Sequence, residues 1–371
     1  MSLTHESLEA GVTIEQEEMV LHSLHPLNAG IAPEVAREKF ITPQKRFFIR
    51  SHGSIPDVDG ETYRLSVSGR VKVPLELSLD DLRIEFASSS VVATLQCAGH
   101  RRSELAAVQP IRGEVAWDAD AISTAEWRGV RLREVLLAAG IGPGVKHVAF
   151  LGLDEIEKGG ERFGFGASIP LEKALSGEVL LAYEMNGEPL TREHGFPLRV
   201  VVPGYIGARS VKWLGGIRLQ ASPSNNYFQR HAYKLFPPDT QAADANWEEG
   251  KVLSDLAINT VICRPRASEV LPAGPVTIQG YAITGEGAHI EAVELSLNGG
   301  ATWREATLLE RPHPWTWCFW EASFQLEPGC YEIVARAWDS RGRTQPANLR
   351  EVWNFKGYMN NAWHRLHVSV F

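Results

Sequence analysis

The spacing of hydrophobic residues along this chain changes once, near position 260. Over residues 63–219, apolar runs of strand length at 145–151, 179–183 and 198–202 are separated by segments with other spacing. Short apolar runs of this kind are typical of buried strands. Strands and helices do not alternate in a regular repeat here. This part therefore predicts a mixed domain of the α+β class rather than a uniform series of strand–helix units.

Two segments of the same part predict helices. Ser78 and Asp81 stand at the spacing of a capping box, which predicts a helix start at Ser78. A second helix is predicted by an apolar stripe that stops at Gly140, a residue type that often ends helices. The stripe consists of Leu132, Val135, Leu136 and Ala139.

After position 261 the apolar residues alternate with polar ones. Val293, Leu295 and Leu297 alternate up to Asn298-Gly299-Gly300, a typical hairpin turn sequence. Short strands between tight turns predict a β-sandwich. The turn-rich stretch 220–258 is interpreted as a segment that crosses between the two parts, with several aromatic residues that need packing partners.

Chain length and charge restrict the function further. The 371 residues are enough for two domains, and the pattern divides them into an irregular arm (1–40), a mixed domain (41–258) and a sandwich with a tail (259–371). The net charge of -8 argues against nucleic-acid and acidic-membrane binding. Residues 1–20 lack the basic and apolar regions of a secretory signal. A cytoplasmic location is expected, or a periplasmic one if a leader has been removed.

The four cysteines are few and far apart, so a disulfide framework is not expected, although Cys318 and Cys330 stand where neighbouring strands can bring them together. Cys97 is the most informative of them. It ends an apolar run and is followed by Ala98-Gly99-His100-Arg101-Arg102. A thiolate is a soft metal ligand, nearby arginines favour it, and small residues leave room for a cofactor. A buried structural cysteine and a nucleophile paired with His100 are the alternatives.

Several segments together resemble the sulfite oxidase family of molybdenum enzymes, over about residues 40–371. The segments are Thr94-Leu95-Gln96-Cys97-Ala98-Gly99 with Arg101-Arg102, Phe47-Phe48-Ile49-Arg50-Ser51-His52, Leu180-Leu181-Ala182-Tyr183-Glu184-Met185-Asn186-Gly187, residues 194–204, Gly207-Ala208-Arg209-Ser210-Val211-Lys212-Trp213, Trp353-Asn354-Phe355-Lys356-Gly357 and Asn361-Ala362-Trp363-His364-Arg365.

The resemblance implies a molybdopterin-binding domain followed by an immunoglobulin-like sandwich that forms homodimers. It makes Cys97 the protein ligand of molybdenum, with the remaining ligands supplied by dithiolene sulfurs and oxygens. Arginine and lysine suit a phosphate, and an aspartate can accept hydrogen bonds from a pterin ring. The other cofactor-binding residues that it implies are His52, Asp154, His194, Arg199, Arg209, Ser210 and Lys212.

The resemblance also implies a substrate pocket for sulfite. The residues expected there are Arg50, Arg102, Trp117, Tyr233 and Lys356, of which Trp117 taken alone is more typical of core packing. The activity expected is oxidation of sulfite to sulfate. No heme-binding His-Pro-Gly-Gly loop is found, since His25-Pro26 lacks the glycines, so electrons are expected to pass to an external acceptor, a cytochrome or dioxygen.

Two departures from the family leave the substrate open. The family commonly has asparagine where this chain has His100, and sulfite oxidases usually have arginine where this chain has Lys356. An imidazole at position 100 can add positive charge or titrate near neutrality. Met359-Asn360-Asn361 is more similar to nitrate reductases of the same family. A nitrate reductase, a sulfoxide reductase, and a dimeric binding module with an empty pocket are therefore retained as alternatives.

Overall fold

Residues 19–40 are more regular than the sequence suggested. The computed structural model describes residues 19–371, and here β1 (Met19–Ser23), β2 (Asn28–Ile31) and β3 (Ile49–Arg50) form one sheet. A short helix, α1 (Pro33–Ala36), follows β2. The Ile31 amide donates to the Asp120 carbonyl at 2.9 Å. The prediction of an irregular arm is wrong for this part, because the hairpin binds the domain behind it; residues 1–18 lie outside the described range.

Two five-stranded sheets form most of the mixed domain, beside a small hairpin of β9 (Ile156–Lys158) and β10 (Glu161–Phe163). The first has the order β11-β8-β15-β4-β5, with β15 parallel to β4 and the other pairs antiparallel. Its strands are β4 (Leu65–Gly69), β5 (Leu75–Leu77), β8 (His147–Gly152), β11 (Gly166–Pro170) and β15 (Leu214–Gln220). The second has the order β13-β12-β7-β6, and β14 also pairs with β12. Its strands are β6 (Ser88–Gln96), β7 (Ile122–Arg131), β12 (Leu180–Met185), β13 (Glu188–Pro189) and β14 (Arg199–Val201).

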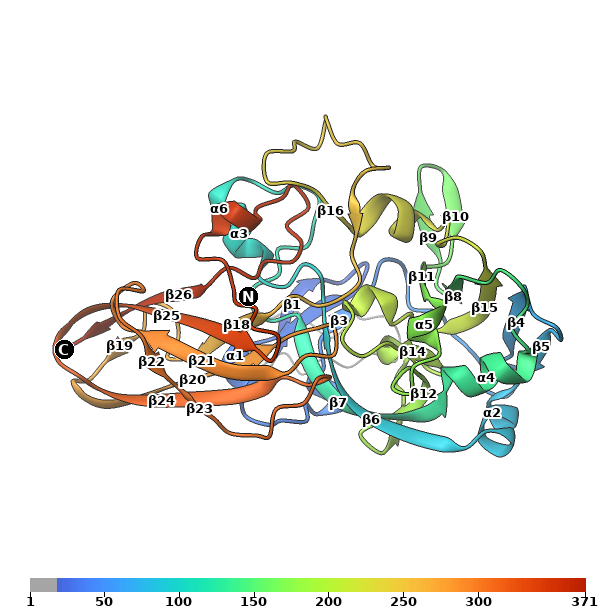
Figure 1. Cartoon of the computed structure of the whole chain (residues 1–371), viewed down its shortest axis with the longest axis horizontal. Helices are drawn as coiled ribbons and strands as arrows, with labels where there is room; N and C mark the ends of the chain where they lie inside the picture. The colour runs from blue at the N-terminus through green and yellow to red at the C-terminus, as the bar shows by residue number, and fades with distance from the viewer. Residues whose placement is uncertain (1–18) are drawn as a thin grey trace.

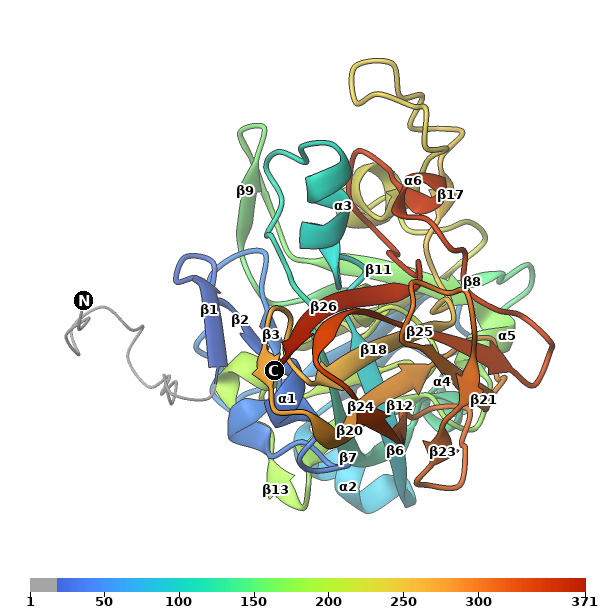
Figure 2. The same cartoon turned by 90° about the vertical axis from the view of Figure 1, so that its left-hand side faces the viewer.

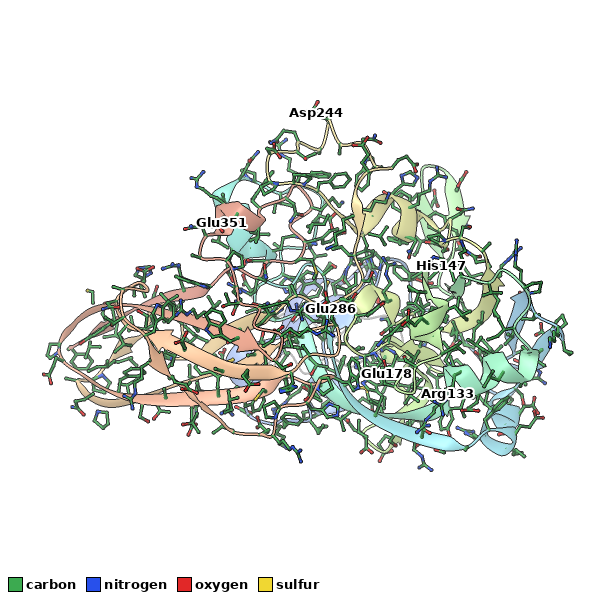
Figure 3. The ribbon with its side chains drawn as sticks, viewed as in Figure 1. Arg133, His147, Glu178, Asp244, Glu286 and Glu351 are labelled. Atoms are coloured by element: carbon green, nitrogen blue, oxygen red, sulfur yellow. The ribbon has the colours of Figure 1, made fainter. Side chains whose placement is uncertain are left out.

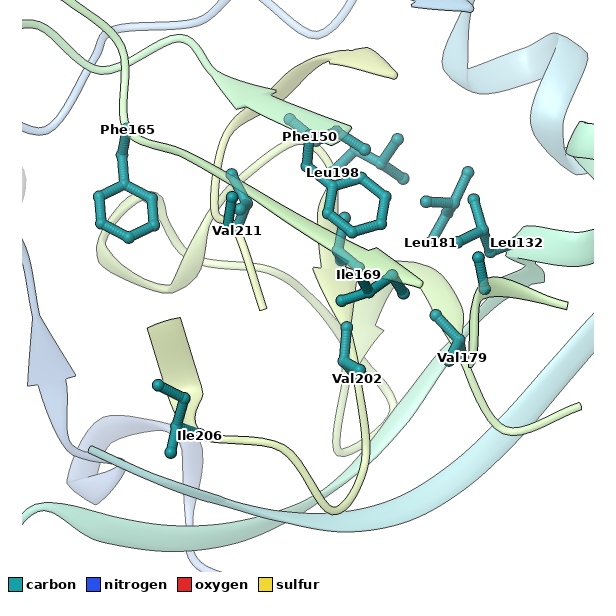
Figure 4. Close-up of a cluster of buried hydrophobic side chains, with 14 of the residues drawn as sticks. Leu132, Phe150, Phe165, Ile169, Val179, Leu181, Leu198, Val202, Ile206 and Val211 are labelled. Atoms are coloured by element: carbon teal, nitrogen blue, oxygen red, sulfur yellow. The ribbon is translucent and has the colours of Figure 1, made fainter. Parts of the chain in front are cut away.

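The core of this domain lies between its two sheets. Phe150 and Ile169 from the first sheet pack with Leu181 from the second and with Leu198 and Val202 beside β14 (Figure 4). All five are buried. The strand-like runs predicted at 145–151, 179–183 and 198–202 correspond to β8, β12 and β14. Their continuous apolar character reflects burial on both faces.

The predicted helices are confirmed. In α2 (Leu79–Glu85) the Ser78 hydroxyl accepts from the Asp81 amide, and the Asp81 carboxylate accepts from the Ser78 amide. Helix α4 (Leu132–Ala139) buries its predicted stripe and ends at Gly140, whose φ is +67°. The other helices of the domain are α3 (Arg102–Val108) and α5 (Leu171–Ala174).

The second part is a β-sandwich, as predicted. One sheet has the order β18-β20-β24-β23 and the other the order β19-β26-β25-β21-β22 (Figure 1). The first sheet contains β18 (Asn259–Arg264), β20 (Gly274–Ile283), β23 (Thr307–Leu308) and β24 (Cys318–Leu326). The second contains β19 (Val270–Leu271), β21 (Ile290–Ser296), β22 (Arg304–Glu305), β25 (Gly329–Asp339) and β26 (His364–Val370). The core between them includes Ile278, Trp320 and Ile333.

The crossing segment and the tail meet over the mixed domain. Helix α6 (Leu349–Val352) lies beside α3 in both views (Figures 1 and 2). The segment between β16 (Lys234–Leu235) and β17 (Lys251–Val252) rises to a tip at Asp244 (Figure 3). Its Phe236 and Trp247 pack against Phe355 of the tail, with ring centroids 5.1 and 5.9 Å from it. Beyond them, the Met359 amide donates to the Ala98 carbonyl at 2.7 Å, next to Cys97.

Cys97, Cys263, Cys318 and Cys330 are all unpaired, so Cys318 and Cys330 do not form the disulfide left open above. Within residues 19–371 no helix is both long and apolar enough to cross a bilayer.

Candidate active site

Cys97 stands at the start of a tight turn between β6 and α3. Its amide donates to the Ala121 carbonyl at 3.0 Å, which continues the pairing of β6 with β7. The Gly99 amide donates a hydrogen bond to the Cys97 sulfur at 3.4 Å. An N–H donor aimed at sulfur stabilises negative charge there. The strand thus holds a buried sulfur in a fixed direction at its end.

A cavity of about 660 Å³, counting its open mouth, lies against this sulfur. Most of the residues predicted for the site line it: Arg50, His52, Cys97, Asp154, His194, Arg199, Ser210, Lys212 and Tyr233. Arg50 lies in β3 and Arg199 in β14. The others come from the segments after β3, β6 and β8, from those before β14 and β15, and, for Tyr233, from the crossing segment. The fold therefore brings segments far apart in sequence to one opening.

Arg199 and Lys212 make the wall of the cavity strongly positive. The Arg199 guanidinium donates to the carbonyls of His194 and Ser210 at 2.9 and 3.2 Å, while its buried Nε has no partner. Burial lowers the pKa of Arg199 to about 9. Lys212 donates to the Glu193 carbonyl at 2.7 Å, and burial, with the charge of Arg199, lowers its pKa to about 7. Both cations lack a nearby anion that fully compensates them.

His194 stays neutral beside these cations. Its Nε2 lies 3.0 Å from the Gln44 carbonyl, so Nε2 carries the proton. Burial, then the charges of Lys212 and Arg199, lower its pKa to about 3. Its Nδ1 is therefore an acceptor.

His52, Tyr233 and Asp154 supply hydrogen-bonding groups of another kind. The Tyr233 hydroxyl lies 2.9 Å from His52 Nε2. Burial lowers the pKa of His52 far below its usual value, so the ring is neutral, and burial raises the pKa of Tyr233, so the phenol keeps its proton. Asp154 accepts from the Phe165 amide at 2.8 Å, and burial raises the pKa of its carboxyl group.

Arg50 adds a positive charge to the wall of the cavity, which Tyr233 also lines. It lies in β3, and its guanidinium donates to the Asn28 side chain at 3.1 Å and to the Ser51 carbonyl. Asn28 is buried and belongs to β2. The N-terminal hairpin therefore orients a predicted substrate residue.

Arg102 and Lys356 meet outside the cavity lining. The Arg102 guanidinium donates to the carbonyls of Lys356 and Val115 at 3.0 and 2.6 Å. The Lys356 ammonium group binds the Glu114 carboxylate, whose other oxygen lies 3.8 Å from Arg102. A Cβ added at Gly99 would lie 2.4 Å from the Arg102 guanidinium. The glycine therefore makes room for Arg102 rather than for the cofactor expected from the sequence.

Two further predicted site residues, Arg209 and Trp117, do not line the cavity either. Arg209 donates one hydrogen bond from each of its three side-chain nitrogens, two to the Leu253 carbonyl and one to the Gln229 side chain. Trp117 is fully buried and packs against His22, with ring centroids 4.4 Å apart. Trp117 matches the core-packing alternative that its residue type favours.

Arg101 and His100 face the sandwich. Arg101 binds Glu104 at 2.7 Å and the Asn259 side chain at 2.7 Å, rather than an anion beside Cys97. His100 Nε2 lies 3.0 Å from the Tyr281 hydroxyl. Burial and the charge of Arg101 hold the pKa of His100 well below its usual value. The expectation that His100 adds charge or titrates near neutrality is therefore wrong.

The residues fit a molybdopterin cofactor. The unpartnered Arg199 Nε and the lowered pKa of Lys212 both indicate a missing anion, as a phosphate group would be. Asp154 and the free Nδ1 of His194 can accept from ring N–H groups. No group of three or more His, Cys, Asp or Glu side chains able to hold a metal occurs in residues 19–371. A lone thiolate suits a metal whose other ligands are not protein groups.

Comparisons with known proteins agree with this assignment. Residues 52–228 match the model of the oxidoreductase molybdopterin binding domain, and residues 250–371 match that of the Mo-co oxidoreductase dimerisation domain. The sulfite oxidase of Arabidopsis thaliana is 39% identical over 93% of this chain and 92% of its own length. The chain belongs to the sulfite oxidase family of molybdopterin oxidoreductases. It is an oxidoreductase of this family.

Other relatives match almost the whole of this chain but differ in how much of their own length the match covers. Mitochondrial sulfite oxidase of Homo sapiens is 43% identical over 94% of this chain, which spans 65% of that protein. Nitrate reductase [NADH] 1 of Oryza sativa is 39% identical over 93% of this chain and 40% of its own length. The solved structure of the sulfane dehydrogenase SoxCD from Paracoccus pantotrophus superposes with a TM-score of 0.82, at 26% identity, over 100% of this chain and 93% of that one. The predicted fold of a molybdopterin-binding domain with a dimerisation domain is confirmed.

Sequence reasoning missed residues that carry no motif of their own. Glu114 lies in the loop after α3 and binds two predicted substrate residues. Tyr358 stacks on Tyr233, with ring centroids 5.3 Å apart and planes at 21°. Ser51 accepts from Lys212 at 3.2 Å. For Ser51, its place beside Arg50 in a family motif was an available signal, and Tyr358 directly follows the motif that ends at Gly357, whereas nothing marked Glu114.

Proposed function

We propose that this protein binds molybdopterin with molybdenum through Cys97 and oxidises sulfite to sulfate. The observation that supports this most directly is the cavity that unites the Cys97 sulfur with Arg50, Arg199 and Lys212 in a molecule of net charge -8. A local positive cavity in a negative molecule is suited to anions alone. The sulfite oxidases of Arabidopsis and Homo sapiens, by their names, support the same substrate.

The side chains divide into two groups in this proposal. Arg199 and Lys212 bind the cofactor phosphate, and His52, Asp154, His194 and Ser210 meet the pterin. When bound, the cofactor supplies oxygen-atom transfer and a two-electron change at the metal. Arg50 and Arg102 hold the sulfite anion, with Lys356 as the third positive group. The phenol of Tyr233 donates a hydrogen bond to His52 Nε2, which is 2.9 Å away.

The overall reaction converts sulfite and water into sulfate, with release of two protons and two electrons. The electrons pass to an external acceptor, for which a cytochrome and dioxygen are the candidates, and no heme is proposed in this chain. The dimerisation domain at 250–371 supports a homodimer. We place the domain boundaries at 40/41 and 258/259, close to the start of β18 at Asn259, and the protein in the cytoplasm, or in the periplasm if a leader has been removed.

Nitrate reduction is the second candidate, and one contact favours it. Glu114 neutralises part of the charge of Arg102 and Lys356. A pocket with less net positive charge suits a monoanion such as nitrate better than a dianion. The nitrate reductase of Oryza sativa supports this alternative. Sulfoxide reduction, and a role as a binding module without chemistry, remain to be separated by the same assays.

One preparation can separate these candidates. Molybdenum per chain is measured first, by elemental analysis. Sulfite oxidation with cytochrome c or dioxygen, nitrate reduction with a reduced dye, and methionine sulfoxide reduction are then measured on the same sample. The proposal expects about one molybdenum per chain, a kcat/KM highest for sulfite, and competitive inhibition by sulfate. A higher kcat/KM for nitrate overturns it in favour of the second candidate.

A further inference from the structure

A carboxylate already occupies the space between two cations of the expected substrate pocket. The Glu114 carboxylate binds the Lys356 ammonium group with one oxygen, and its other oxygen lies 3.8 Å from the Arg102 guanidinium. The Glu114 side chain is 12% exposed and that of Arg102 is 4% exposed. The hydrogen bonds of Arg102 are to backbone carbonyls, which cannot move away on their own. Glu114 is therefore the displaceable partner in this group.

We propose that Glu114 is a specificity-determining residue, an internal anion that competes with the substrate oxyanion for Arg102 and Lys356. The inference rests on the proposed function, because it takes those two residues as the anion pocket. A carboxylate and a sulfur oxyanion present similar oxygens to guanidinium and ammonium donors. Binding of a dianion therefore requires Glu114 to leave or to be repelled, which lowers the affinity of the pocket for dianions.

The loop around Glu114 allows this movement. Gly113 precedes it with a φ of +74°, and no heavy atom lies within 4 Å of a Cβ added there. Arg112 and Gly113 are exposed. A glycine in open space lets the following residue turn at small cost. Displacement of Glu114 can therefore begin with a turn at Gly113 that meets no steric obstacle.

The charge of Glu114 also acts electrostatically on a group that lines the cavity. Burial is the main cause of the raised pKa values of Tyr233 and Tyr358, and the Glu114 carboxylate adds to both. Tyr233 lines the cavity, and Tyr358 stacks on it at 5.3 Å. An anion bound near Tyr233 therefore experiences repulsion from Glu114.

The test is calorimetric titration of the holoenzyme with sulfate, which binds without being turned over. Glu114→Gln removes the charge with little change in shape, and we expect it to bind sulfate about 10- to 100-fold more tightly at fixed ionic strength, as loss of one close charge permits. Glu114→Asp keeps the charge and is expected to stay close to the wild type. The matched control is Glu178→Gln, which breaks a Lys173–Glu178 pair of similar burial in the same domain (Figure 3).

A double variant sharpens the result. Glu114→Gln with Lys356→Met removes one charge of each sign, so sulfate affinity is expected to return toward the wild type. An unchanged or weaker sulfate affinity in Glu114→Gln overturns the inference. Glu114 would then have only a structural role, in holding the Lys356 side chain in place. Failure of the proposed function is seen separately, as absence of sulfite oxidation in enzyme that contains molybdenum and binds sulfate.

Discussion

At the scale of single residues, burial decides which groups in the cavity carry charge. Lys212 and Arg199 keep cationic donors that lack full compensation, while His52 and His194 are kept neutral. Cofactor binding therefore meets guanidinium and ammonium donors together with uncharged imidazole acceptors. The same burial makes the empty site costly, because desolvated cations destabilise the folded protein until an anion binds.

Replacement of Cys97 by serine tests the ligand directly. Cys97→Ser removes the soft sulfur while the amide bond to Ala121 and the burial of the side chain are retained. We expect loss of turnover and of most of the bound molybdenum, with an unchanged circular dichroism spectrum. Cys263→Ser is the control, since that cysteine is buried in the sandwich strand β18. Full activity in Cys97→Ser would falsify the assignment.

Lys212 predicts a pH dependence of stability in cofactor-free protein. Its pKa is about 7 when folded, against 10.5 as the ordinary value, so between these pH values the unfolded chain binds more protons than the folded one. Stability therefore rises with pH across this window, by an amount on the order of a few kcal/mol. Urea unfolding at pH 7, 8 and 9 should show the rise, and Lys212→Met should reduce it. The exposed Lys72→Met is the control, and an equal slope in both variants contradicts the prediction.

Of the two arginines proposed to bind sulfite, Arg50 and Arg102, a substitution of Arg50 is the easier to interpret. Arg50→Gln keeps a donor for Asn28 but removes the charge, and loss of one preorganised donor is expected to lower kcat/KM for sulfite by about 10²–10³. Arg50→Lys restores the charge without the planar fork and should recover part of the loss. Rates are compared per bound molybdenum. A kcat/KM for Arg50→Gln equal to that of the wild type would show that sulfite does not bind to Arg50.

The sequence predicted the functional residues of the site only where they belong to a family motif. Cys97, Arg50 and Lys212 were recognised because residues on both sides match the family. Glu114 was missed because its partners, Arg102 and Lys356, are 12 and 242 positions away, and no local pattern reports such a contact. Arg209 was expected at the cavity because motif membership cannot tell which way a side chain turns.

At the scale of elements, the turn from β6 to α3 is the feature on which the site depends. Capping at Ser78, the stripe of α4 and the alternation of β21 are local signals, so the sequence predicted these elements. The N-terminal hairpin was missed because its stability comes from distant partners, such as the Asp120 carbonyl bound by Ile31 and the Asp120 carboxylate bound by His22 at 2.6 Å. Pairing of this kind has no local pattern in the sequence.

Gly99→Ala tests the turn. The new Cβ would lie 2.4 Å from the Arg102 guanidinium, which two backbone carbonyls hold in place. We expect a KM for sulfite raised on the order of tenfold with only a small drop in Tm, because the atom displaced is the end of a side chain. Gly177→Ala is the control, since the nearest heavy atom, from the Arg133 side chain, would lie 3.6 Å from the new Cβ. An unchanged KM shows that Arg102 can move without affecting the substrate.

At the scale of the whole molecule, the sandwich supports the Cys97 turn. Arg101 reaches from the start of α3 to the Asn259 side chain and the Ala362 carbonyl at 2.7 and 2.9 Å. His100 meets Tyr281 of β20, and the Met359 amide binds the Ala98 carbonyl. These contacts are buried and cross between the two domains. The sandwich therefore contributes to the geometry of the cavity as well as to assembly.

The assembly itself is the last prediction, a homodimer with two-fold symmetry formed through the sandwich. Residues 250–371 match a dimerisation domain, and Val270 and Phe371 of the sandwich leave large apolar surfaces 63% and 71% exposed. Sedimentation at micromolar concentration should give twice the mass of one chain. A chain ended before Val261 should be monomeric or insoluble, because it loses both the interface and the partners of Arg101. A full-length protein that stays monomeric over this range contradicts the prediction.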